Sequence, residues 1–110
     1  MPTLDQLMSL PGAFGALEFS CTGDLIESRG DLQPDFAEVA AQLCAANMAN
    51  YRMQALGWAK HTGEGGFFPE QGFFFIGLDY VIMAMGTKAL FARSRDVDYD
   101  LSFRVLNDRV

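Results

Sequence analysis

The feature that most constrains this chain is a long helical pattern, from Pro34 to about Lys60, that is apolar around most of its circumference. Two apolar rows run along it: Val39, Leu43 and Ala46 form one, and Ala37, Ala41, Cys44, Met48 and Ala55 form the other. Together they cover far more than the stripe of roughly 100° that suffices to dock a helix on one sheet. A helix this apolar needs partners on two sides. In a chain of 110 residues, the pattern predicts that the second partner is another copy of the chain.

Length and charge narrow the class of protein. A chain of 110 residues, half of them apolar, fits one domain spanning 1–110 that buries its own core. The net charge of −6 disfavours nucleic acid or an anionic membrane surface as the main partner. The N-terminus shows no signal peptide, and no apolar run is long enough to cross a bilayer. Cys21 and Cys44 share no C-x-x-C pattern, so we expect reduced thiols in a cytoplasmic protein.

The elements follow from local signals along the chain. The pattern Thr3-Leu4-Asp5-Gln6 predicts a capped first helix, and Gly23 predicts the turn of a hairpin over 13–29. The expected order is helix, two strands, long helix, three strands (72–78, 80–85 and 89–94) and a last helix capped by Asp98. The last three strands are apolar on both faces, which indicates a sheet covered on both sides.

The chain resembles the roadblock family over essentially its whole length. The resemblance rests on this order of elements, the capped first helix, the hairpin around 22–24, the Ala-rich helix from Pro34 and the three apolar strands. The resemblance implies an α/β (α+β) domain of roadblock/profilin-like type. Its five-stranded antiparallel sheet would lie between the long helix and the two terminal helices. It also implies homodimers in which the long helices pack together and central strands pair at their edges. Many bacterial members of the family have a short final helix. Family members act as non-catalytic scaffolds and as regulators of small Ras-like GTPases.

The expected dimer interface combines small residues of the long helix with aromatic residues of the third strand. Small side chains let two helix backbones approach closely, and an apolar edge strand gains by pairing. The candidate residues are Ala41, Cys44, Ala45, Met48, Arg52, Phe73 and Phe75. The pattern does not decide which of the two rows meets the partner. A polar arc of Asn47, Asn50 and Gln54 is either a solvated groove or a hydrogen-bonded ladder between paired helices.

Motifs that would carry chemistry are incomplete. Asp96, Asp98 and Asp100 begin like a calcium loop, but the glycine and the final glutamate are missing. The glycines between 63 and 66 match neither phosphate-binding spacing. His61 is the only histidine, and Cys44 lies mid-helix, where a packing role is expected. We therefore expect no catalysis, no bound metal and no organic cofactor.

Two functions fit these observations. The first is a homodimeric interaction module that binds a nucleotide-switch protein. The alternative is a small-molecule sensor, because phenylalanines from Phe67 to Phe103, with Met83 and Met85, could line an internal apolar pocket. Aromatic residues more often form plain core, which favours the first. The loop 63–72, with Phe67-Phe68-Pro69, departs from the family pattern, and its role is left open.

Overall fold

The structure, a computed structural model, describes residues 2–63 and 71–108. Its elements are α1 (Leu4–Met8), β1 (Ala13–Phe19), β2 (Leu25–Gly30), α2 (Pro34–Thr62), β3 (Gly72–Ile76), β4 (Tyr80–Met85), β5 (Lys88–Arg93) and α3 (Tyr99–Leu106). The predicted order of helices and strands is confirmed. The predicted loop over 64–70 lies outside the described residues.

The ends of the helices form where the sequence signals place them. The Thr3 hydroxyl accepts a hydrogen bond from the Gln6 backbone N–H at 3.1 Å, and the Gln6 side chain accepts one from the Thr3 N–H at 2.8 Å. Asp98 caps α3 by accepting from the Leu101 N–H at 3.0 Å. Gly63 ends α2 with a φ of 72°, a conformation that glycine adopts at little cost. The helix thus includes 61–62, which the sequence pattern assigns to the following loop.

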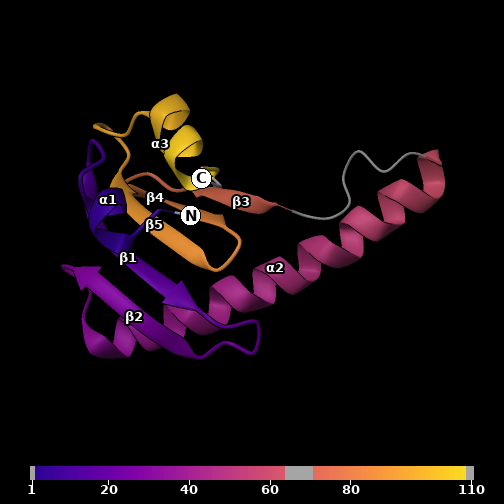
Figure 1. Ribbon diagram of the computed structural model, residues 1–110, viewed down its shortest axis with the longest axis horizontal. Coiled ribbons are helices and arrows are strands. Elements are labelled where there is room, and N and C mark those ends of the chain that lie inside the picture. Colours follow the sequence, from indigo (N-terminus) through magenta and orange to yellow (C-terminus); the bar gives the residue numbers. More distant parts are fainter. Residues whose placement is uncertain (1, 64–70, 109–110) are drawn as a thin grey trace.

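The five strands form one sheet in the order β2-β1-β5-β4-β3 (Figure 1). Every neighbouring pair is antiparallel. The first hairpin joins the strand triplet through β1 and β5, whose residues Ala16 and Leu90 are partners in the register. β2 and β3 are therefore the two edges of the sheet.

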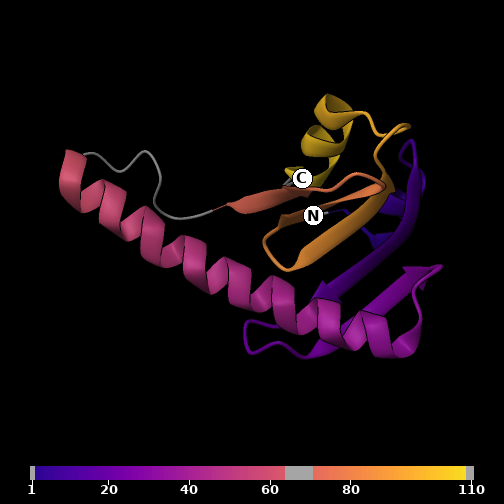
Figure 2. The same ribbon diagram turned by 180° about the vertical axis from the view of Figure 1, so that it is seen from behind.

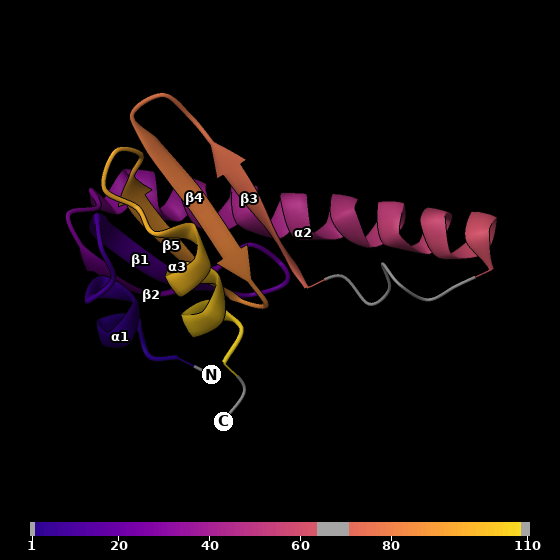
Figure 3. The same ribbon diagram turned by 90° about the horizontal axis from the view of Figure 1, so that it is seen from above.

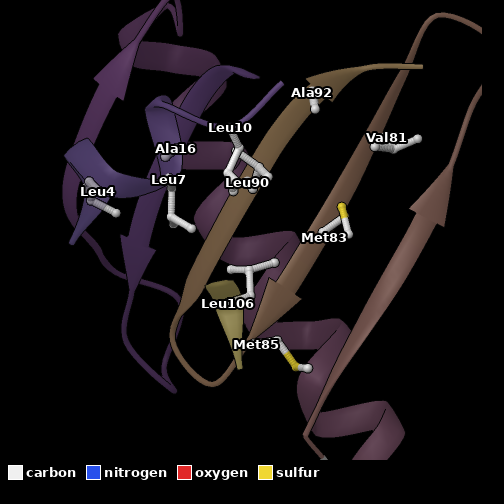
Figure 4. Packing of buried hydrophobic residues seen from close by; sticks show 10 residues of the cluster. All are labelled: Leu4, Leu7, Leu10, Ala16, Val81, Met83, Met85, Leu90, Ala92 and Leu106. Atoms are coloured by element: carbon white, nitrogen blue, oxygen red, sulfur yellow. The ribbon is translucent and has the colours of Figure 1, made fainter. Parts of the chain in front are cut away.

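Helices cover both faces of the sheet. α2 runs along one face, and α1 and α3 lie on the other (Figures 1 and 2). On the α1 and α3 side the buried cluster consists of Leu4, Leu7, Leu10, Ala16, Val81, Met83, Met85, Leu90, Ala92 and Leu106 (Figure 4). On the α2 side it consists of Leu17, Phe19, Ala40, Ala41, Cys44, Ala45, Phe73, Ala84, Ala89 and Phe91. The predicted fold class is confirmed.

The long helix is longer than the sheet that it covers. Its 29 residues span about 44 Å at 1.5 Å per residue. Its N-terminal half packs on the sheet, whereas its C-terminal half projects beyond the β3 edge (Figures 1 and 3). Within the described residues, no helix combines the length and hydropathy needed to cross a membrane.

Candidate functional site

An apolar groove opens between the N-terminal half of α2 and the β3–β4 part of the sheet. It has a volume of about 290 Å³ and is lined by Phe36, Val39, Ala40, Leu43, Cys44, Asn47, Phe73, Phe75, Tyr80, Ile82 and Phe91. Asn47 is the one amide side chain among these lining residues. Leu43 remains 60% exposed and Phe75 59% exposed, so the groove is open to solvent along its outer side.

Aromatic rings build the floor and walls of the groove. Phe91 is fully buried in the sheet, and the Phe36 ring of α2 meets it edge-on with centroids 5.7 Å apart. The Tyr80 ring lies 6.5 Å from the Phe91 ring. The Tyr51 ring lies 5.7 Å from the Phe73 ring, and this contact ties the middle of α2 to the edge strand. Such ring pairs have preferred geometries, so the groove is held in a defined shape.

The predicted interface residues divide between the core and the surface. Ala41, Cys44 and Ala45 are buried between α2 and the sheet of the same chain. Met48 packs at the margin of the same cluster. In the described conformation these side chains contact their own sheet rather than an outer partner. The row Ala37, Ala41 and Cys44 is therefore the inner one.

Of the remaining predicted residues, two are exposed and one is buried. Arg52 is exposed on α2. Phe73 is buried under Tyr51, and Phe75, two residues further along the same strand face, is exposed and lines the groove. β3 thus presents one covered and one open aromatic ring toward α2.

The sequence-based list of interface residues omits the outer row of α2. Val39 and Leu43 are 50% and 60% exposed, and with Phe36 they form the helix side of the groove. The row was visible in the sequence as Val39, Leu43 and Ala46. Helical periodicity gives the angle between the two rows, but it does not say which row meets the sheet.

The opposite face of β3 carries a second, smaller aromatic group. The Phe74 ring stacks on the Tyr99 ring with centroids 6.4 Å apart and meets the Phe103 ring at 6.3 Å. Beyond it, Ile76 remains 62% exposed at the free edge. An apolar edge strand of this kind offers unpaired backbone groups to another strand.

The side chains with possible catalytic or metal-binding chemistry are dispersed. Burial raises the pKa of the Cys44 thiol to about 11, which keeps it protonated and unreactive at neutral pH. Cys21 is exposed in the β1–β2 turn, and both cysteines are free. Over residues 2–63 and 71–108, no group of three His, Cys, Asp or Glu side chains is arranged to hold a metal ion.

Solved structures share this architecture. The roadblock/LC7 domain of Streptomyces avermitilis is similar over 91% of this chain and 81% of that chain, with a TM-score of 0.69 and 17% identity. Myxococcus xanthus MglB is similar over 91% and 79%, with a TM-score of 0.70 and 23% identity. A structure described as MglB with tetrameric arrangement covers 94% and 79%, with a TM-score of 0.69 and 20% identity. At these identities the likeness establishes the fold alone, and that fold is the roadblock fold.

The sequence family is defined separately. The family model of the uncharacterized conserved protein DUF2173 matches residues 3–108, and the chain belongs to this family. No curated protein matches the sequence.

Proposed function

We propose that this chain is a non-catalytic, homodimeric interaction module that scaffolds or regulates a protein partner, with a small Ras-like GTPase as the expected class. The observation that carries the proposal is the apolar surface that one protomer leaves open, formed by the outer row of α2, the groove and the β3 edge. Val39, Leu43 and Phe75 are each at least half exposed there. Surfaces of this kind in soluble proteins mark sites of protein contact.

The roadblock fold supports this proposal. The resemblance drawn from the sequence implies dimers and GTPase regulation, and two of the similar solved structures are MglB proteins, one with a tetrameric arrangement. Self-association is the part of the proposal with the most direct physical support, because exposing the groove to water costs roughly 25 cal/mol per Å² of apolar surface. We also propose a cytoplasmic location, since a reducing compartment suits two free thiols.

The alternative, a sensor with an internal pocket, fits the groove less well. A groove of about 290 Å³ is at the small end of ligand sites. Because the groove is open on one side, an apolar ligand bound there would remain partly in water. A second protein surface would cover both the groove and the exposed apolar side chains around it. We therefore favour the interaction module.

The test has two parts. Light scattering and sedimentation of the purified chain at micromolar concentration should give twice the chain mass of 12.1 kDa. Ras-like GTPases encoded by the same organism, loaded with GDP or a GTP analogue, should then be titrated with the dimer. We expect binding to one nucleotide state over the other. A well-behaved monomer would refute the dimer, and equal or absent binding to both states would refute the GTPase assignment.

A further inference from the structure

One side of α2, the side that borders the groove, is free of charged residues along its whole length. At about 100° per residue, the residues on this stripe are Phe36, Val39, Leu43, Asn47, Asn50, Gln54, Trp58 and His61. The four charged residues of the helix, Asp35, Glu38, Arg52 and Lys60, all fall outside it. In a chain with a net charge of −6, such a stripe can meet an identical stripe without like-charge repulsion.

The stripe is also symmetric in its spacing. Val39 lies as far before the midpoint between Met48 and Ala49 as Trp58 lies after it. The same relation holds for Phe36 with His61, for Leu43 with Gln54, and for Asn47 with Asn50. Two copies of the helix, packed antiparallel about a twofold axis at this midpoint, would bring these residues opposite one another.

This midpoint lies beside the centre of the edge strand. The Tyr51 ring contacts the Phe73 ring at 5.7 Å, and Asn47 lines the groove together with Phe73 and Phe75. The helix around residues 47–51 therefore lies against the middle of β3. A single twofold axis can relate two β3 edges and two α2 stripes at the same time.

We infer that the groove of each protomer is filled by the partner subunit's Trp58. This inference rests on the proposed dimer and specifies how it is anchored. Trp58 is 53% exposed on the half of α2 that projects beyond its own sheet (Figure 3). In the antiparallel arrangement this half lies over the other protomer, where the partner subunit's Trp58 meets Val39 at the mouth of the groove. Tryptophan is among the residues enriched at the hot spots of protein interfaces, which lie in well-packed, desolvated pockets.

The inference explains two features together. The groove has aromatic walls that suit the large flat face of an indole ring. The projecting half of α2 carries exposed apolar side chains, Met53 at 72% and Trp58 at 53%, with little of its own sheet beneath them. The exposed apolar side chains of the C-terminal half of α2 thus complement the apolar groove beside its N-terminal half.

Tryptophan fluorescence provides the first test, because Trp58 is the only tryptophan. Emission and iodide quenching are measured across a dilution series whose monomer–dimer distribution is known from sedimentation. We expect the emission maximum to move to shorter wavelength and the quenching constant to fall as the dimer forms. The two transitions should share one midpoint concentration.

A mixing experiment tests whether the contact runs between subunits. One chain carries Val39→Asp, which spoils the groove and retains Trp58. The second carries Trp58→Phe, which retains the groove and is silent in emission. Mixing the first chain with an excess of the second should shift the emission to shorter wavelength. The matched control replaces the second chain by one with both substitutions, and it should produce no shift.

The outcomes separate this inference from the proposed dimer. A wild-type chain that is monomeric at all concentrations overturns both. A wild-type dimer whose tryptophan emission and quenching do not change with dilution overturns the Trp58 anchor and leaves the dimer standing. A dimer that gives the same shift with the doubly substituted control also overturns the anchor, because the groove would then play no part.

Discussion

Replacing Leu43 by alanine should weaken the dimer and leave the folded protomer almost unchanged. Leu43 lies on the outer row of α2, 60% exposed, at the wall of the groove. In the proposed dimer this exposed part is covered by the second copy. The matched control is Leu56→Ala, which makes the same substitution in the same helix. Leu56 is 48% exposed, but it does not line the groove and, at about 100° per residue, it lies on the opposite side of the helix from Phe36.

The magnitude follows from the exposed fraction. Shortening leucine to alanine removes three carbon atoms, worth about 2.4 kcal/mol if all were buried, at about 0.8 kcal/mol per CH₂. Only the 60% still exposed in the protomer changes environment on dimerisation, which gives about 1.4 kcal/mol per copy. Both copies lose this contribution in a twofold dimer, so the total is about 3 kcal/mol, or about a hundredfold rise in Kd.

Sedimentation equilibrium of the wild type and both variants measures this effect directly. Leu43→Ala should raise the dimer Kd about a hundredfold, and Leu56→Ala should leave it within about threefold of the wild type. Circular dichroism should show equal helix content in all three. If the two variants weaken the dimer equally, or if neither does, the outer row beside the groove is not the dimer surface.

Three further predictions follow from burial and backbone geometry. Ala41→Arg places a charge at a fully buried position and should lower Tm by more than about 10 °C in a circular dichroism melt. The control Ala49→Arg, at an exposed position of α2 outside both the inner and the outer row, should melt near the wild type; equal melting would contradict the inner-row assignment. Because burial raises the pKa of Cys44 to about 11, only about one thiol in a thousand is ionised there at pH 8. Ellman's reagent should therefore titrate one thiol, Cys21, rapidly in the native protein and the second only after unfolding; two fast thiols would show that the Cys44 site is open. Gly72→Ala would place a Cβ atom 1.9 Å from a backbone carbonyl oxygen of β4, so it should loosen the edge strand and lower both Tm and dimer affinity; an unchanged melt and Kd would exclude this clash.

The order and type of the elements could be predicted from the sequence because their signals are local. Thr3 and Gln6 complete a capping box from side chains three residues apart, and Gly23 provides the left-handed conformation that its turn requires. The doubly apolar strands indicated a sheet covered on both faces, and helices do cover both faces. Each of these signals depends on neighbours along the chain, and no long-range packing is needed to interpret it.

The end of the long helix was less well determined by the sequence. The pattern weakens after Lys60, and a glycine-rich segment follows. Here α2 continues to Thr62 and ends at Gly63, whose N–H donates to the Ala59 carbonyl at 2.9 Å. A glycine does end the helix, as the sequence indicated, but the two residues before it, 61 and 62, are helical.

The candidate site required the tertiary structure. The sequence determined that α2 has two apolar rows, but not which row faces the sheet. The alanines at 37, 40, 41 and 45 pack inward because small side chains let the helix approach a sheet that already presents Phe19 and Phe91. The bulkier Val39 and Leu43 are left outside for that reason. This choice depends on the volumes of side chains from β1 and β5, which are distant in sequence and meet α2 only once the sheet has formed.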